Sequence, residues 1–181
     1  LDALYGNELT ALCRPEELMQ LVASGEQVAR RCGVPLETAM ISDVPGYTWG
    51  IVPVLAQAGV KYFSIGPNRT DRIGGTLAAW GDKPFYWETP SGEQRVLCWV
   101  AGEGYSFFHR GSLAHLIEPL LAYLGQLEAS GYPYELVQAR YSIGGDNGPP
   151  DPSMCDFVRD WNETHASPRL EIATASEMCR A

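Results

Sequence analysis

The sequence predicts an α/β fold in which a mainly parallel sheet is covered by outer helices. Short apolar runs, each too short for a helix, alternate along the 181 residues with longer segments whose apolar residues recur at helical spacing. Turns rich in glycine and proline separate the two kinds of segment. Strands that alternate with helices in this way pair in parallel, because each helix returns the chain to the same edge of the sheet.

The first part of the chain is expected to form two helices and four strands. The first helix covers 13–33, where Pro15 suits the first turn and Gly33 the end. The second covers 49–58, and Pro53 is expected to confine it to its later turns. The expected strands are short apolar runs bounded by turn residues, at 38–42, 60–65, 84–87 and 95–101, of which the last two form a hairpin.

The remainder adds two helices and two strands. The longest helix is expected over 112–130, with a kink at Pro119, and another over 152–165, capped by Asp151. Strands are expected at 135–143 and 169–174. One mainly parallel sheet should therefore contain 40–41, 62–63, 97–99, 137–139 and 172–173. A closed (β/α) barrel typically needs about 250 residues, so the chain could form only part of one, and a free-standing three-layer domain is the alternative.

Composition and charge argue against several classes of function. Thirteen Lys and Arg against 22 Asp and Glu give a net charge of -9 with no basic cluster, so nucleic acid is not an expected partner. No apolar run approaches the roughly 20 residues that span a bilayer. The five cysteines are scattered and odd in number, which favours a reducing compartment such as the cytoplasm without deciding the location. Nothing in the sequence indicates an oligomeric state.

The ends of the chain indicate an interior piece of a longer protein. It opens with Leu1 rather than Met, and it stops at Ala181 just as Ser176 and Glu177 begin what resembles another helix. We therefore expect residues 1–181 to form a single partial domain whose upstream and downstream parts lie outside this chain.

Two carboxylates follow expected strands. Asp43 comes directly after 38–42, and Asp146 lies in the glycine- and proline-rich loop after 135–143. Ligands of parallel sheets bind at the carboxyl ends of the strands, and two carboxylates facing one cleft are what cleavage of a glycosidic bond uses. One attacks or stabilises C1 and the other moves a proton. The alternative is that both are ordinary turn residues, because Asp is common in such turns.

Aromatic and polar residues near these carboxylates are candidate sugar contacts. Tyr47, Trp49 and Tyr105 lie in expected loops, where ring faces can pack on the C–H patches of a sugar. His109 follows an aromatic run, and Asn147 lies in the glycine-rich loop, where its amide could bind hydroxyls. The alternative for each ring is that it fills the interface between helix and sheet.

One segment resembles a known family of enzymes. Residues 41–50, with the sequence ISDVPGYTWG, followed by 60–63, resemble the strand–Asp–Pro-Gly–helix–strand unit of glycoside hydrolase family 38. That family contains the class II α-mannosidases, and the closer likeness is to its bacterial relatives. Residues 105–108 and 144–147 fit the same layout, and the likeness covers roughly 8–178.

The resemblance implies a (β/α)7 barrel with one zinc ion and a retaining mechanism. Asp43 matches the family's nucleophile, which also touches the metal, and Asp146 is the nearest match to the acid/base, with Asn147 where the family has a second acid. The family's other zinc ligands, a His-x-Asp pair and a later His, have no match in the 181 residues. The full-length protein is thus expected to be an α-mannosidase-like hydrolase of carbohydrates, and this chain alone to be inactive.

Two other functions stay open at this point. A metal-dependent carbohydrate deacetylase has a similar barrel and uses an Asp base with a metal-bound water. A non-catalytic carbohydrate-binding domain could keep the fold without the acid/base. The upstream sequence discriminates among the three, because His-x-Asp there supports the glycosidase, and Asp-Asp followed later by His-x-x-x-His supports the deacetylase. Absence of both supports the binding domain.

Overall fold

The computed structural model describes the chain except residues 45, 69–79, 81, 107, 111 and 144–147. The chain divides into two compact units. Unit 1 comprises residues 1–105 together with 175–181, and unit 2 comprises residues 106–174.

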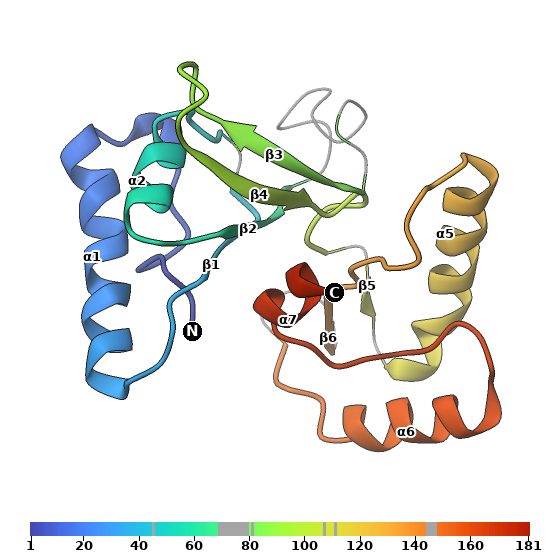
Figure 1. Cartoon of the computed structure of the whole chain (residues 1–181). Coiled ribbons are helices and arrows are strands. Elements are labelled where there is room, and N and C mark those ends of the chain that lie inside the picture. The colour runs from blue at the N-terminus through green and yellow to red at the C-terminus, as the bar shows by residue number, and fades with distance from the viewer. Residues whose placement is uncertain (45, 69–79, 81, 107, 111, 144–147) are drawn as a thin grey trace. The chain divides into compact units, whose positions relative to one another are not determined.

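Unit 1 is built from one sheet and the helices that accompany it (Figure 1). Its elements in chain order are a 3-10 turn (Thr10–Leu12), α1 (Pro15–Cys32), β1 (Thr38–Ser42), α2 (Ile51–Gln57), β2 (Tyr62–Gly66), β3 (Pro84–Glu88), β4 (Arg95–Val100) and α7 (Ala175–Arg180). The strand order is β1-β2-β4-β3. The pairs β1–β2 and β2–β4 are parallel, whereas β3 and β4 form the expected antiparallel hairpin. The prediction of a mainly parallel α/β sheet is therefore confirmed for this part of the chain.

Helices α1 and α2 lie against one face of this sheet (Figure 1). Successive side chains of a strand point to opposite faces, so Ile41, Phe63 and Cys98 share the face that packs against them. All three side chains are fully buried. Helix α1 begins at Pro15 and ends before Gly33, whose φ of 65° is the left-handed conformation that glycine adopts without strain.

The two prolines expected to disturb helices lie in first turns instead. Pro53 is the third residue of α2, which therefore begins before it, so the expectation that Pro53 confines the helix to later turns is wrong. Pro119 is the third residue of α5 (Ile117–Ala129) rather than an interior residue. The first four N–H groups of a helix have no partner within the helix, so proline costs no hydrogen bond at either position.

Unit 2 is a smaller group of helices and two short strands. Its elements are β5 (Phe108–Arg110), a 3-10 turn (Leu113–His115), α5, β6 (Tyr141–Ile143) and α6 (Met154–Thr164). The strands β5 and β6 pair in parallel with each other and do not belong to the four-stranded sheet. The core consists of Phe108, Leu113, Leu116, Leu120 and Tyr123.

Two expected strands of the parallel sheet are therefore corrected. Of 135–143 only β6 is a strand, and residues 137–139 are not. None of residues 169–174 is in a strand, so 172–173 do not join the sheet. The side-chain amide of Asn162 accepts a hydrogen bond from the Leu170 N–H and donates one to the Leu170 carbonyl, at 2.9 and 2.8 Å. A side chain thus binds the backbone groups that a neighbouring strand would otherwise bind.

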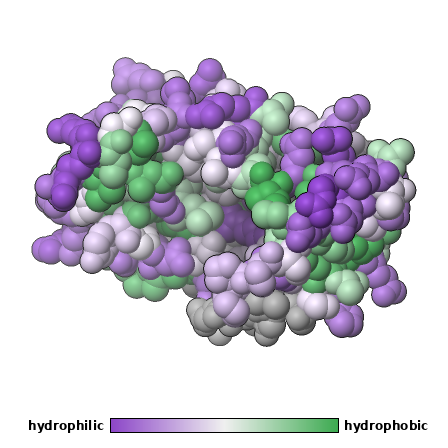
Figure 2. Space-filling view, turned by 90° about the horizontal axis from the view of Figure 1, so that it is seen from below, coloured by the Kyte–Doolittle hydropathy of each residue, from purple (hydrophilic) through white to green (hydrophobic). Residues whose placement is uncertain are grey.

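The surface facing the reader in Figure 2 is mostly hydrophilic, with apolar residues in separate groups. Among the helices of the described residues, none combines the length and the apolar character needed to cross a bilayer.

A close approach of two backbones predicts the effect of a substitution in α1. A Cβ atom at Gly25 would lie 2.4 Å from the carbonyl oxygen of Ala3, which is far inside contact distance. We expect Gly25→Ala to destabilise the protein by about 1–3 kcal/mol, although alanine favours helices by roughly 1 kcal/mol. Denaturant unfolding measures the change.

Gly125 in α5 provides the matched control, because a Cβ there would meet no atom within 4 Å. Gly125→Ala is expected to leave stability unchanged or to raise it by up to about 1 kcal/mol. Equal effects of the two substitutions would contradict the packing of Gly25 against Ala3.

Candidate functional site

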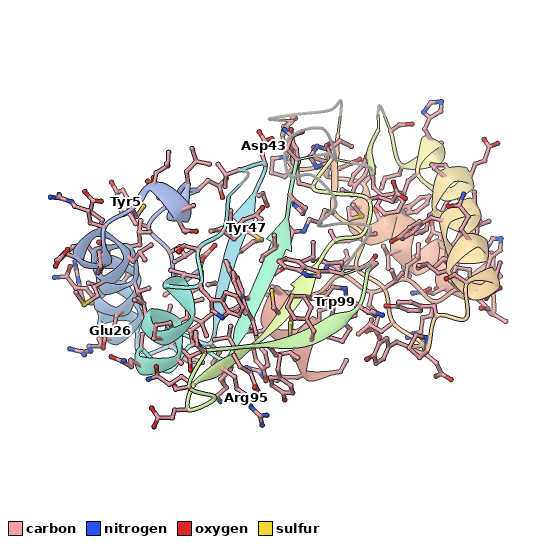
Figure 3. The ribbon with its side chains drawn as sticks, turned by 90° about the horizontal axis from the view of Figure 1, so that it is seen from above. Tyr5, Glu26, Asp43, Tyr47, Arg95 and Trp99 are labelled. Carbon is pink, nitrogen blue, oxygen red and sulfur yellow. The ribbon has the colours of Figure 1, made fainter. Side chains whose placement is uncertain are left out.

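The candidate site begins at the edge where β1, β2 and β4 end. Because these strands are parallel and Ser42 pairs with Gly66, their carboxyl ends lie at one edge of the sheet. Asp43 follows β1, Asn68 follows β2 after a buried proline, and Tyr105 follows β4 after a short turn. Figure 3 shows Asp43 at the end of its strand.

Asp43 has an unusual backbone conformation and is held by two residues from the end of β2. Its φ of 69° makes it the one non-glycine residue with positive φ in the described part of the chain. Its N–H donates to the Gly66 carbonyl at 2.8 Å, which extends the β1–β2 pairing by one residue. The Asn68 side-chain Nδ2 donates to its Oδ1. The carboxylate is nevertheless exposed, so it is both oriented and accessible.

The residues on either side of Asp43 are fixed by the segment that precedes α1. The hydroxyl of the fully buried Thr10 accepts from the Thr48 N–H at 3.0 Å and donates to the Gly46 carbonyl at 3.3 Å. The Asn7 side chain accepts from the Ser42 N–H at 3.0 Å. These bonds hold the turn after β1 in one place, which a loop carrying a reacting group requires.

The two tyrosines proposed as sugar contacts lie in different surroundings. Tyr47 is half-buried and packs against the core of unit 1, which is the interface-filling alternative considered above. The Tyr105 N–H donates to the Pro67 carbonyl at 3.1 Å, so this residue adjoins the end of β2. Gly104 permits the approach, because it has φ of 80° and a Cβ there would lie 2.7 Å from the Pro67 oxygen.

The structure does not bring the Trp49 indole to Asp43. The indole N–H donates to the Glu88 carbonyl, and the ring lies 6.3 Å from that of Trp87 between centroids. Glu88 pairs with Arg95, the first residue of β4, and is therefore at the amino edge of the parallel strands. Figure 3 shows Arg95 and Asp43 at opposite ends of the sheet. Trp49 ties the β3–β4 hairpin to α2, and its proposed contact with sugar stays a prediction.

The other predicted site residues belong to unit 2. His109 is the middle residue of β5, pairs with Ser142, and donates its N–H to the Ser106 carbonyl at 3.1 Å. Asp146 and Asn147 lie outside the described residues, so their predicted roles, and the prediction that both carboxylates share one end of a sheet, stay predictions. Strand β6 ends at Ile143, just before their loop.

Residues on the two sides of that loop are tied together. The Tyr141 hydroxyl donates to Asp151 Oδ2 at 2.9 Å. Asp151 Oδ1 accepts from the hydroxyl of Ser153 at 2.6 Å and from its N–H at 2.9 Å. The Ser153 bonds lower the pKa of Asp151, whereas burial and the bond to Asp151 raise the pKa of Tyr141 to about 12. The bridge keeps the start of α6 beside β6.

Sequence reasoning did not single out two polar residues near the sheet. One is Asn68, which occurs in a Gly-Pro-Asn stretch that indicates only a turn. The other is Asp82, a buried carboxylate that accepts the Trp99 indole N–H at 2.6 Å. No local pattern marks either contact, because each joins residues 17 or more positions apart.

The described residues supply only part of what a zinc ion needs. Zinc in proteins usually has four ligands, and the carboxylate of Asp43 is a suitable one. Within the described ranges, no three His, Cys, Asp or Glu side chains come together in a way that could bind a metal. The residues present therefore fit one ligand position and do not complete a site.

Comparison with known proteins gives a family and a related fold. The family model described as the glycosyl hydrolases family 38 N-terminal domain matches residues 7–181. A 4-alpha-glucanotransferase from Thermococcus litoralis has a similar fold, with a TM-score of 0.54 and 15% sequence identity. The match covers 99% of this chain but 26% of that protein, so the chain spans about a quarter of its length. No curated protein matches the chain.

The Asp151 contacts predict a pH-dependent effect on stability. Because the folded protein lowers the pKa of this carboxyl below its ordinary value of 3.8, its charge stabilises the fold above that pH, and the contribution disappears as the pH falls through the lowered value. We expect Asp151→Asn to lower the melting temperature at pH 7 and to lower it by less at an acidic pH below 3.8. A difference that is the same at both pH values would contradict this assignment.

Proposed function

The chain belongs to family 38 of the glycosyl hydrolases, and from this we propose that the complete protein is a retaining, α-mannosidase-like glycosidase. The membership confirms the resemblance found in residues 41–50 and 60–63. The observation that carries the proposal is the Asp43 carboxylate, which is exposed yet held at the carboxyl edge of a parallel sheet by Gly66 and Asn68.

The proposed reaction has two steps. In the first, an Asp43 oxygen attacks the anomeric carbon, the bond to the leaving oxygen breaks, and Asp146 gives that oxygen a proton. In the second, water attacks the anomeric carbon, the ester bond to Asp43 breaks, and Asp146 takes a proton from the water. The sugar keeps its anomeric configuration, because each step inverts it once.

We extend the proposal to the surroundings of Asp43. The sheet of unit 1 would be part of a (β/α)7-type barrel completed by other parts of the protein. Asp43 would be one ligand of a zinc ion whose other ligands lie outside the described residues, and the ion would supply positive charge for sugar oxygens. Among the aromatic candidates Tyr105 is the best placed, because its backbone adjoins the end of β2 beside Asn68. His109 and Asn147 stay proposed contacts with sugar.

Replacing the nucleophile tests the proposal in the full-length protein supplied with zinc. Asp43→Asn should reduce cleavage of an aryl α-mannoside by roughly 10³-fold or more, because an amide cannot form the glycosyl ester. Folding should be retained, since Asn tolerates the left-handed backbone and still offers an oxygen to Asn68. A fluorosugar with a reactive leaving group should label the unchanged protein on the peptide that contains Asp43.

Asp160→Asn is the matched control, because this carboxylate is exposed and pairs only with its neighbour Arg159 among the described residues. It should leave activity unchanged. Wild-type rates in Asp43→Asn, or labelling of a peptide without Asp43, would rule out the proposed nucleophile.

The proposed acid/base role of Asp146 can be tested with substrates that have different leaving groups. If Asp146 protonates the leaving oxygen, Asp146→Asn should slow a natural glycoside by about 10²–10⁴-fold and an activated aryl glycoside far less, because that leaving group needs little protonation. The ratio of the two kcat/KM values measures the effect. Equal losses on both substrates would remove Asp146 from the acid/base role.

A further inference from the structure

We propose that Asn68 is a positioning residue for the Asp43 carboxylate, one that fixes Oδ1 and thereby presents Oδ2 to the reacting carbon. The inference rests on the proposed role of Asp43 as nucleophile. Its basis is the hydrogen bond from Asn68 Nδ2 to Asp43 Oδ1, which joins the end of β2 to the end of β1.

The chemistry of the two groups fixes which atoms meet. An ionised carboxylate can only accept hydrogen bonds, so the amide nitrogen of Asn68, and not its oxygen, must face Asp43. Together with the bond from the Asp43 N–H to Gly66, this contact holds the residue at both its backbone and its side chain. Rotation of the carboxylate about its χ angles is then restricted, and Oδ2 has no hydrogen-bond partner among the described residues.

The same hydrogen bond serves both steps of the proposed reaction. Before the attack, it holds the Asp43 carboxylate in the orientation from which Oδ2 can reach the anomeric carbon. In the glycosyl ester Oδ2 is bonded to carbon, and Oδ1 becomes the carbonyl oxygen that Asn68 still contacts. When water displaces the carboxylate, the donor again stabilises the negative charge that returns to Oδ1.

Asn68 is itself held in place, as a positioning residue must be. It follows the fully buried Pro67, whose ring fixes φ and whose carbonyl accepts the Tyr105 N–H at 3.1 Å. Gly104 lets the chain after β4 pass this carbonyl, since a Cβ there would lie 2.7 Å from the oxygen. The ends of all three parallel strands thus contribute to the orientation of one carboxylate.

The experiment distinguishes positioning from a purely structural bond between strand ends. In the full-length protein with zinc, Asn68→Ala should lower kcat for an aryl α-mannoside by about 10–100-fold and change KM by less than about threefold. The rate at which a reactive fluorosugar labels Asp43 should fall by a similar factor, because labelling uses the same attack by Oδ2.

Asn68→Asp provides a second variant that keeps the size and the turn preference of Asn, so the test does not depend on whether the alanine variant folds. It replaces the amide donor with an acceptor and places a second carboxylate beside the first, so kcat should fall further than in the alanine variant. Gly25→Ala is the structural control. Its Cβ would lie 2.4 Å from the Ala3 carbonyl oxygen and contacts neither Asp43 nor Asn68, so this variant should have a lower melting temperature but a kcat and a labelling rate close to wild type.

The outcomes separate this inference from the function on which it rests. If Asp43→Asn is inactive but both Asn68 variants keep the wild-type kcat and labelling rate, Asn68 does not position the nucleophile, whatever their melting temperatures. If Asp43→Asn remains active, the proposed function itself fails. A lower kcat with little change in KM in Asn68→Asp and Asn68→Ala, together with a wild-type kcat in Gly25→Ala, supports the inference.

Discussion

The parallel register between β1 and β2 is the constraint on which the geometry at Asp43 depends. Side chains alternate between faces, so a slip of one residue would move Ile41 or Phe63 from the buried face to the other face. Burying one such side chain stabilises the fold by about 1.5–3 kcal/mol, which makes the slip costly. With that register Ser42 lies opposite Gly66, and the next N–H, that of Asp43, reaches the Gly66 carbonyl. The packing of the core therefore determines the position of the Asp43 carboxylate.

The parts of the fold that the sequence predicted are those whose signal is local. Helix α1 has an apolar face with proline at one end and glycine at the other, and the strands of unit 1 are short apolar runs between turns. Residues 169–174 have the same apolar character, yet Ile172 is 59% exposed and the Leu170 backbone binds the Asn162 side chain. Whether an apolar run becomes a strand depends on its partner, which the run itself does not contain.

The residues of the candidate site likewise include some that a local pattern predicts and some that it does not. Asp43 was predicted because a carboxylate directly after a buried strand occupies the edge where parallel sheets bind ligands. Asn68 was missed, because it lies 25 positions from Asp43 along the chain and the pairing of β1 with β2 brings the two residues together. Trp49 shows the converse, because it lies only six positions after Asp43 and yet its indole is bound to the hairpin at the other edge. Closeness along the chain is a poor guide to a site assembled by tertiary pairing.

The remaining question about Asp43 is whether a turn alone accounts for it. A left-handed backbone favours glycine, although Asp and Asn also tolerate it, so the conformation alone does not require a carboxylate. The bond from its N–H to Gly66 needs no side chain. The bond from Asn68 needs one oxygen, which asparagine would supply equally well. None of these contacts requires a negative charge, and the side chain that carries it is exposed. The turn therefore does not require a carboxylate at this position, and an exposed one is compatible with the proposed role of Asp43.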